Sequence, residues 1–192
     1  MTKNRKHFPQ TKSDFQIISG GQTGVDRAAL DVARELEIPC GGWIPKGRRA
    51  ENGAIPEWYP LREMPSSRYS VRTAKNVREA TGTLILTWGP PTGGTALTVK
   101  LARKQRKPFL LVDLAQGGDP ETVRDWLRKN EIKILNVAGP RESQVPGIPD
   151  RAVGFLRQVL KKGRSVPGTR ESQRPYGAPG IQNRKYRRIK AM

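Results

Sequence analysis

IISGGQTGVDRAALD, residues Ile17 to Asp31, is the stretch of sequence that decides the fold. An apolar run from Phe15 to Ile18 breaks into the glycine-rich residues 19–24, and from Val25 onward apolar residues recur at helical spacing. The pattern predicts a strand, a tight turn and a helix. Backbone N–H groups at such a turn, together with the helix dipole, favour an anion such as phosphate. The spacing matches neither G-x-G-x-x-G nor G-x-x-x-x-G-K-[ST], so a turn without a ligand is the alternative.

Two further predicted strands end in glycine-containing turns. A continuous apolar strand over residues 83–88 leads into GPPTGGT, residues Gly89 to Thr95, and a helix is expected to follow. A strand over residues 132–137 leads into AGPRES, residues Ala138 to Ser143, and a last helix is expected from about Asp150 to Lys161. The motif at Ser19 to Gly24 is therefore one of three similar turns.

Strands and helices alternate along the chain. Further strands are expected within residues 39–45 and 109–112, and further helices after a cap at Ser66 and Ser67 and after the cap Asp119. This alternation is typical of an α/β fold: a doubly wound, Rossmann-like, mostly parallel sheet of about five strands in a single domain. Because ligands of such sheets bind beyond the C-terminal strand ends, the three turns predict one shared pocket for a phosphorylated small molecule.

Charge divides the chain into three parts. The 192 residues include 36 Lys and Arg against 17 Asp and Glu, a net charge of +19. We expect residues 1–14 to form a basic flexible arm, residues 15–162 the ligand-binding domain, and residues 163–192 a basic, disordered tail. Residues 161–192 carry a net charge of +9, which favours nonspecific contact with RNA or DNA, and a solubilising tail is the alternative.

The single cysteine, Cys40, excludes an intrachain disulfide and favours a reducing compartment. No apolar run approaches the length of a membrane span, and residues 1–13 lack the apolar segment of a secretory signal. We therefore expect a cytoplasmic protein with no membrane contact. With His7 and Cys40 isolated from each other, no protein-ligated metal site is expected. A homo-oligomer is left open.

Residues 46–65 show no period and carry several cations, including Lys46 and Arg48. A loop of this length inside a domain is usually functional, so we expect it to fold over an anionic ligand. A solvated insertion is the alternative. The four tryptophans are expected in or near the core, with Trp88 the best candidate for stacking because it borders the second turn.

Six motifs in order resemble the molybdenum carrier family: SGGQTGVDRAALD (19–31), GGWIPKGR (41–48), IPEWYP (55–60), RTAKNV (72–77), TLILTWGPPTGGTAL (83–97) and LNVAGPRESQVPG (135–147). That family is similar to a Rossmann-like superfamily that includes DprA-type DNA-processing proteins and lysine-decarboxylase-like hydrolases. The resemblance implies binding of molybdenum cofactor, a phosphate-bearing pterin, and carriage rather than catalysis.

The hydrolase relatives imply an alternative, cleavage of the N-glycosidic bond of a nucleotide. Their glycine turn ends in Gly-Thr and is followed closely by a catalytic glutamate. Here Gly94 and Thr95 match, but no carboxylate follows them. Asp26 or Glu142 could replace the missing acid, since both follow glycine turns. Whether the protein is an enzyme is left open.

The residues expected to contact the ligand fall into three groups. Two are backbone cradles, and the third consists of polar side chains at helix starts, on one helix face or in the long loop. The alternatives are an Arg27–Asp31 surface pair, a stabilising role for Asp26 at the helix N-terminus without a ligand, and solvated positions for the other side chains. The first cradle is Gly20, Gly21, Gln22, Thr23 and Gly24; the second is Thr92, Gly93, Gly94 and Thr95; the side chains are Asp26, Arg27, Lys46, Arg48, Arg72 and Asn76.

Overall fold

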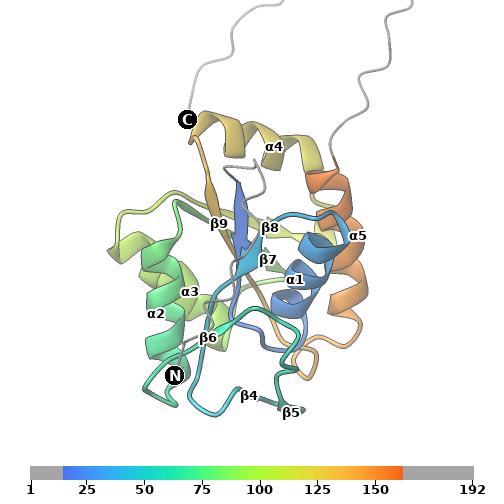
Figure 1. Cartoon of the computed structure of the whole chain (residues 1–192). Helices are drawn as coiled ribbons and strands as arrows, with labels where there is room; N and C mark the ends of the chain where they lie inside the picture. The colour runs from blue at the N-terminus through green and yellow to red at the C-terminus, as the bar shows by residue number, and fades with distance from the viewer. Residues whose placement is uncertain (1–14, 162–192) are drawn as a thin grey trace, which may run out of the picture. The chain divides into compact units, whose positions relative to one another are not determined.

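The central sheet contains five parallel strands in the order β2-β1-β9-β7-β8, in a computed structural model that describes residues 15–161 (Figure 1). The expected arm and tail lie outside the described residues. The strands are β1 (Gln16–Ile18), β2 (Cys40–Gly41), β7 (Gly82–Thr87), β8 (Phe109–Asp113) and β9 (Ile134–Ala138). The predicted Rossmann-like α/β fold is confirmed. The last strand in the chain, β9, pairs with β1 on one side and β7 on the other.

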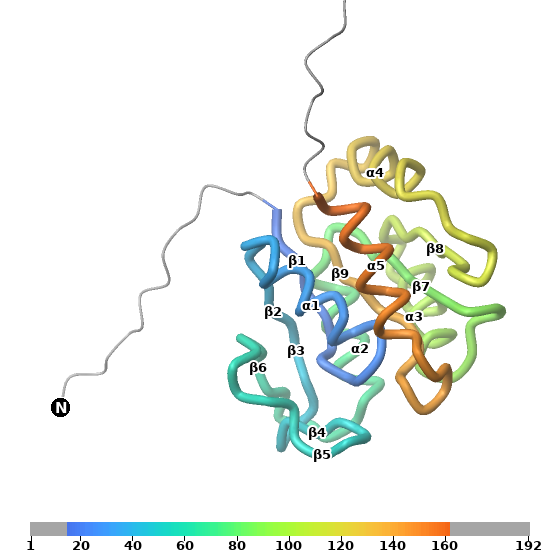
Figure 2. The backbone as a smooth tube through the Cα atoms, turned by 90° about the vertical axis from the view of Figure 1, so that its right-hand side faces the viewer, coloured from blue at the N-terminus to red at the C-terminus, as the bar shows by residue number. Residues whose placement is uncertain are grey.

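Helices cover both faces of the sheet (Figures 1 and 2). α1 (Val25–Glu35) and α5 (Ile148–Leu160) pack together on one face, and α4 (Pro120–Lys129) packs against α5. α2 (Tyr69–Glu79) and α3 (Gly93–Lys104) pack side by side on the other face. A short 3₁₀ turn, Leu114–Gln116, follows β8. None of these helices is long and apolar enough to cross a membrane.

The core lies between the sheet and the pair of helices α1 and α5. All six residues of β7 are buried, as its continuous apolar run predicts for a strand covered on both faces. Leu84 and Leu86 pack with Ile17 and Leu135 of the neighbouring strands. Burying each such side chain contributes roughly 1.5–3 kcal/mol. This packing holds the C-terminal ends of β1, β9 and β7 at one edge.

Residues 39–65 differ most from the prediction. The expected single strand is divided into β2 and β3 (Trp43–Ile44) by Gly42, whose φ is 132° and where a Cβ would lie 2.0 Å from the Ser19 carbonyl oxygen. The expected loop contains the antiparallel pair β4 (Arg49–Ala50) and β5 (Gly53–Ala54), and β6 (Arg62–Glu63), which pairs with β3. Strands of two residues are too short to show a period.

The two predicted helix caps have different outcomes. Asp119 caps α4 by accepting hydrogen bonds from the amides of Glu121 and Thr122, both at 3.0 Å, as predicted. The cap at Ser66 and Ser67 is wrong, because α2 begins at Tyr69 after Arg68 and no side chain caps it. The hydroxyl of Ser66 instead accepts a hydrogen bond from the Arg68 amide.

Candidate functional site

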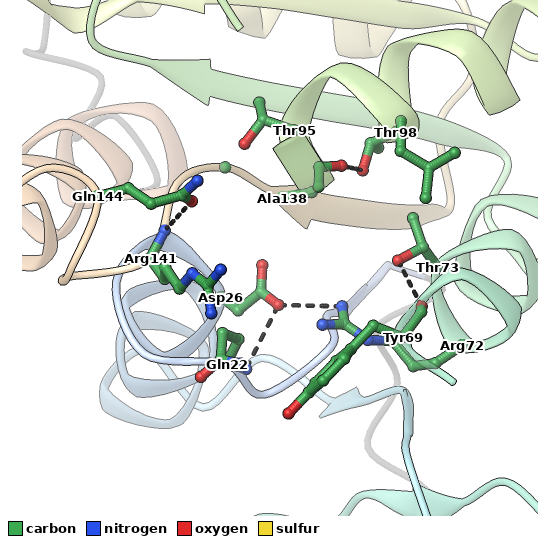
Figure 3. A pocket seen from close by; sticks show the side chains of 13 residues that line it. Gln22, Asp26, Tyr69, Arg72, Thr73, Thr95, Thr98, Ala138, Arg141 and Gln144 are labelled. Atoms are coloured by element: carbon green, nitrogen blue, oxygen red, sulfur yellow. Dashed lines mark hydrogen bonds and ion pairs between the residues drawn. The ribbon is translucent and has the colours of Figure 1, made fainter. Parts of the chain in front are cut away.

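The three glycine-containing turns follow β1, β7 and β9, so they lie at the same edge of the parallel sheet. Residues from all three turns, together with α2 and α3, line a cavity of about 190 Å³ (Figure 3). Its lining is Gln22, Asp26, Tyr69, Arg72, Thr73, Gly94, Thr95, Leu97, Thr98, Ala138, Gly139, Arg141 and Gln144.

A buried ion pair forms one side of the cavity. Asp26 Oδ2 accepts hydrogen bonds from Arg72 Nη1 at 3.2 Å and from the Gln22 amide at 3.4 Å. The side chains of Asp26 and Arg72 are 6% and 11% exposed. Arg72 Nε is buried without a hydrogen-bond partner. In Figure 3 the second carboxylate oxygen of Asp26 points toward Thr95 and Ala138, into the cavity.

Burial raises the pKa of Asp26 above the ordinary value of 3.8, and the nearby Arg72 guanidinium opposes this rise without cancelling it. The carboxyl group therefore holds its proton more tightly than an exposed aspartate does. It can accept or donate a hydrogen bond to a ligand, depending on pH.

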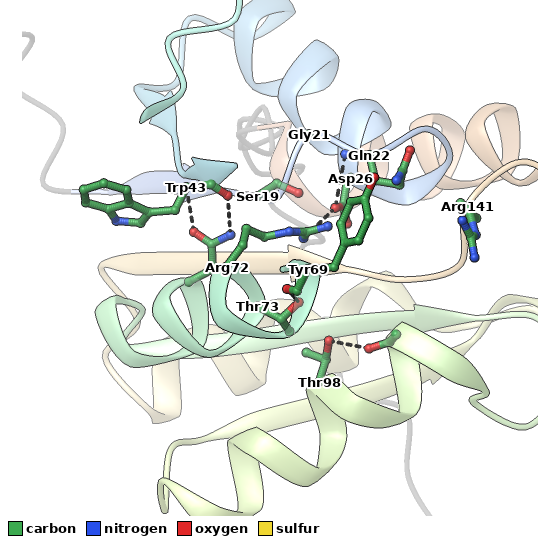
Figure 4. A network of polar contacts seen from close by, with 12 residues as sticks. Ser19, Gly21, Gln22, Asp26, Trp43, Tyr69, Arg72, Thr73, Thr98 and Arg141 are labelled. Atoms are coloured by element: carbon green, nitrogen blue, oxygen red, sulfur yellow. Dashed lines mark hydrogen bonds and ion pairs between the residues drawn. The ribbon is translucent and has the colours of Figure 1, made fainter. Parts of the chain in front are cut away.

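Gly20 makes room for this ion pair. A Cβ at Gly20 would lie 1.5 Å from Arg72 Nη1 and 2.8 Å from Asp26 Oδ2. Figure 4 shows Arg72 extending from α2 past the first turn to reach Asp26. The function of this glycine is therefore explained by packing of the Arg72 side chain, and Gly20 itself does not line the cavity.

The N-terminus of α3 forms the opposite side of the cavity. No side chain caps this helix, and its first residues are Gly93, Gly94 and Thr95. Gly94 and Thr95 line the cavity, and nothing lies within 4 Å of a Cβ built at Gly94. The first-turn amides of an uncapped helix need partners and carry the positive end of the dipole. The expected second cradle thus borders the cavity through Gly94 and Thr95, while Thr92 and Gly93 are exposed beside it.

The first turn is braced from outside by the β4–β5 hairpin. Gln22 Oε1 accepts hydrogen bonds from the amides of Thr23 and Glu51, and the Thr23 hydroxyl donates to Glu51. Glu51 also accepts a hydrogen bond from the amide of Ser143 in the third turn. Burial raises the pKa of Glu51, but hydrogen bonds from Ser143 and Thr23 outweigh this effect and bring the pKa below its ordinary value. Glu51 thereby ties the first and third turns together.

Two more glycines of the first turn serve its packing. At Gly24, with φ of 78°, a Cβ would lie 2.3 Å from the Pro140 carbonyl oxygen, so glycine allows the first and third turns to touch. Gly21 has φ of 70° and its carbonyl accepts a hydrogen bond from Arg27 Nε at 3.3 Å. Of the five residues expected in the first cradle, Gln22 lines the cavity.

The structure places four expected side chains away from the cavity. Arg27 donates to the Gly21 carbonyl and to Asn52, rather than pairing with Asp31. The Arg48 guanidinium donates to the carbonyl oxygens of Ile55, Pro56 and Tyr59, so it holds the long loop together. Lys46 is exposed, and its amide donates to Ser66.

Asn76 is buried and acts as a bracket for β3. Its side chain accepts a hydrogen bond from the Trp43 amide at 2.8 Å and donates to the Trp43 carbonyl at 3.0 Å (Figure 4). Helix spacing favours a solvated position for Asn76, and this expectation is wrong because the residue is only 2% exposed. Asn76 therefore fixes β3 against α2 and does not reach the cavity.

Sequence reasoning missed several cavity residues. Arg141 lies in the third turn and Gln144 directly follows this turn, and Arg141 Nε lies 3.5 Å from Glu51 Oε2. The positions of a cation and an amide side chain close to a third glycine-containing turn could have indicated Arg141 and Gln144. Tyr69 lies three residues before Arg72 on α2, and Thr73 lies four residues after Tyr69, so the helix face that carries Arg72 could have pointed to Tyr69 and then to Thr73. The expectation of core packing is wrong for Trp58, which is 65% exposed, while Trp88 is 42% exposed with Arg151 over its ring.

Metal-ligating side chains do not gather in the described part of the chain. Residues 15–161 hold no group of three or more His, Cys, Asp or Glu side chains that could bind a metal ion. Cys40, on the edge strand β2, is half-buried, and burial raises the pKa of its thiol. The donors around the cavity are guanidinium, amide and hydroxyl groups, which suit an anion rather than a bare cation.

Comparisons with known proteins agree with this fold. The crystal structure of a putative molybdenum carrier protein from Syntrophus aciditrophicus SB is similar, with 48% sequence identity and a TM-score of 0.72 over 76% of this chain and 94% of that one. (E)-4-Hydroxy-3-methyl-but-2-enyl diphosphate reductase matches with 12% identity over 75% of this chain and 59% of its own, at a TM-score of 0.34, which is too low to indicate a shared fold. No curated protein matches the sequence significantly. The model of the circularly permutated YpsA SLOG family matches residues 17–160. The chain therefore belongs to this family, and its resemblance to the molybdenum carriers is confirmed.

Proposed function

We propose that the protein is a carrier or sensor that binds a phosphate-bearing small molecule, a pterin such as molybdenum cofactor or a nucleotide, in the cavity between α1, α2 and α3. The observation that carries the proposal is the meeting of three turns around one cavity that has an uncapped helix N-terminus on one side and the Asp26–Arg72 pair on the other. The name of the similar protein from Syntrophus aciditrophicus supports a molybdenum-containing ligand.

The phosphate is assigned to the α3 side. The first-turn amides at Gly94 and Thr95 are positioned to donate to an anion, and the absence of a side chain at Gly94 allows close approach. Arg141 adds a positive charge from the third turn. On the opposite side, the second carboxylate oxygen of Asp26 and the side chain of Gln22 are suited to bind polar groups of the sugar or ring.

The size of the cavity limits what it can enclose. At about 190 Å³ it is smaller than the range of roughly 300–1,000 Å³ typical of sites that surround a whole ligand. We therefore place the phosphate and its adjoining carbons inside, and the ring outside near Tyr69, which is 41% exposed. Molybdenum would arrive on the pterin, held through the phosphate by the groups named above.

A ligand panel tests the proposal. Nucleotides and phosphorylated pterins are added to the full chain, and the melting temperature is measured. A ligand at one hundred times its Kd adds about 2.7 kcal/mol of stability, which corresponds to roughly 5–10 °C for a domain of this size. Native mass spectrometry of freshly purified protein then identifies any small molecule that co-purifies.

Gly94→Val tests the site itself. The space around Gly94 accommodates a side chain, so the variant stays folded, but the new methyl groups block the α3 amides and abolish the ligand-induced shift. Gly154→Val is the matched control, because Gly154 is also an exposed helical glycine with nothing within 4 Å of its Cβ. If Gly94→Val binds the ligand as the unaltered chain does, the α3 terminus is not the phosphate site.

A nucleotide hydrolase is the second candidate, and Asp26 is the observation that favours it. This carboxyl lines the cavity and its pKa is raised, as suits a general acid. Glu142, the other acid considered, accepts a hydrogen bond from the Gly147 amide and is not among the cavity-lining residues. Incubation with nucleoside monophosphates separates the two functions: a carrier returns the nucleotide intact, whereas a hydrolase releases the base.

A further inference from the structure

The positive charge of the described domain is concentrated in one segment of the chain. Residues 68–107 hold nine Lys and Arg side chains and one acid, Glu79. The other residues between 15 and 161 hold fourteen side chains of each sign. The net charge of this part of the chain therefore comes entirely from the segment that contains α2 and α3, two helices that pack side by side on one face of the sheet (Figure 1).

Six of these nine cations are exposed and belong to none of the ion pairs that the described residues form. The other three have partners: Arg72 pairs with Asp26, Lys75 pairs with Glu79, and Lys107 donates to the Ala80 carbonyl. We call the six the α2–α3 basic face: Arg68, Arg78, Lys100, Arg103, Lys104 and Arg106.

A solvated helix surface does not account for this arrangement. Elsewhere in residues 15–161 acids equal cations in number, and some of them pair, as Arg124 does with Glu121 and Arg157 does with Glu35. The helix dipole favours Arg78 in the last turn of α2 and two cations in the last turn of α3, Arg103 and Lys104. It disfavours Arg68 at the N-terminus of α2 and does not explain Lys100. Six exposed cations without ion pairs, in or beside two neighbouring helices, give this side of the domain a positive potential, so an anionic partner would stabilise them.

We infer that the α2–α3 basic face binds the sugar–phosphate backbone of nucleic acid. α2 and α3 contain 11 and 12 residues, which gives a surface about 17 Å long, enough for several consecutive phosphates of one strand. The exposed large hydrophobic side chains of the two helices are Tyr69 and Val71 on α2, and α3 has none, whereas the centre of a protein–protein interface is apolar and poor in charge. An acidic protein is therefore the less suitable partner.

Tyr69 adds a contact that suits an unpaired strand. It lies at the start of α2, is 41% exposed, and has the Arg72 guanidinium 6.0 Å from its ring centre. Exposed aromatic rings among cations stack the bases of single-stranded nucleic acid. The six cations of the α2–α3 basic face carry this inference without the ligand proposed for the cavity, whereas Tyr69 also lines the cavity and is shared by the two proposals.

Salt dependence of RNA binding tests the inference. Binding of the full chain to a labelled 20-nucleotide poly(U) RNA is measured by fluorescence anisotropy at several salt concentrations. The variant carries Lys100→Gln, Arg103→Gln and Lys104→Gln, which remove three cations from the α2–α3 basic face. The control carries Arg128→Gln, Lys129→Gln and Lys133→Gln, which remove the same charge from exposed positions in and after α4. Circular dichroism confirms that both are folded.

Each phosphate contact contributes about 0.7 to the slope of log K against log salt for a single strand. We expect the face variant to lower the slope by about 2 and to raise Kd about 10- to 100-fold at 0.1 M salt, while the control stays close to the unaltered chain. Equal losses in variant and control would show that only net charge matters and would overturn the inference. Equally tight binding of a 20-residue polyglutamate, weakened by the same three substitutions, would also overturn it, in favour of an acidic protein.

Discussion

Removing the Arg72 guanidinium is expected to destabilise the protein in a pH-dependent way. Arg72→Met retains most of the side-chain volume but leaves the Asp26 carboxylate buried without its partner. At 3.2 Å and an effective dielectric constant of about 20, the lost attraction is about 5 kcal/mol, and measured losses of one partner of a buried pair are roughly 3–5 kcal/mol. Because Asp26 retains its bond to the Gln22 amide, we expect a loss of about 3 kcal/mol at pH 8.

The sign of the pH dependence follows from Asp26. Its pKa in the folded protein already lies above 3.8 because of burial, and it rises further when Arg72 is removed. A carboxyl whose folded pKa is raised makes the protein less stable as pH increases from 3.8 through the folded pKa, since the unfolded chain loses its proton first. The penalty of Arg72→Met therefore shrinks as pH falls from 8 toward 4, where Asp26 becomes neutral.

Urea unfolding of the full chain at a series of pH values measures this penalty. Arg68→Met is the matched control, because Arg68 is an exposed arginine next to the same helix and has no ion pair. Asp26→Asn combined with Arg72→Met should recover about 2 kcal/mol at pH 8, since no buried charge remains. A penalty that is below about 0.5 kcal/mol at pH 8, or that grows as pH falls, would refute the assigned coupling of Asp26 and Arg72.

Three further predictions concern the residues around the site. Gly20→Ala should displace the Arg72 guanidinium, because its Cβ would lie 1.5 Å from Nη1. In urea unfolding, the variant that combines Gly20→Ala with Arg72→Met should lose less stability than the sum of the losses of the two single variants. Asn76→Ala should lower the free energy of unfolding by about 2 kcal/mol by leaving the Trp43 amide and carbonyl without partners, whereas Ser70→Ala on the exposed side of α2 should change it little. Burial of Tyr59 and its hydrogen bond to Asp31 raise its pKa to about 12. An ultraviolet titration should therefore show one tyrosine ionising near pH 12, and the stability of the protein should fall as pH rises above 10. Tyr59→Phe should remove the ionisation near pH 12.

The strand–turn–helix units could be predicted from the sequence because each carries a local signal. The switch from the apolar run ending at Ile18 to helical spacing at Val25 marks a boundary, and the buried residues of β7 show a continuous apolar run. The pairing of β3 with β6 had no such signal, because two-residue strands have no period. Parallel strands then dictate that the turns share an edge, which is why the place of the cavity could be inferred before its residues.

The individual site residues were harder to predict because their partners are distant in the sequence. Asp26 and Arg72 are 46 residues apart, and Thr23 and Glu142 are 119 apart, so neither contact leaves a local pattern. Arg48 has the same basic character as a phosphate-binding residue, yet three nearby carbonyl groups occupy its guanidinium. A cation in a loop predicts a nearby hydrogen-bond acceptor or anion, but it does not show whether that acceptor belongs to a ligand or to the backbone of the loop itself.

The strand order also determines the stage of folding at which the site can form. β9 enters the sheet between β1 and β7 although it is the last strand in the chain, and it is followed by the turn that supplies Gly139 and Arg141. Because β9 lies between them, β1 and β7 do not pair with each other. Among the described strands, β9 alone joins the half that contains β1 and β2 to the half that contains β7 and β8. A ligand held by Gln22, Thr95 and Arg141 would therefore bind only after β9 has docked, and its binding energy would stabilise both halves against separation.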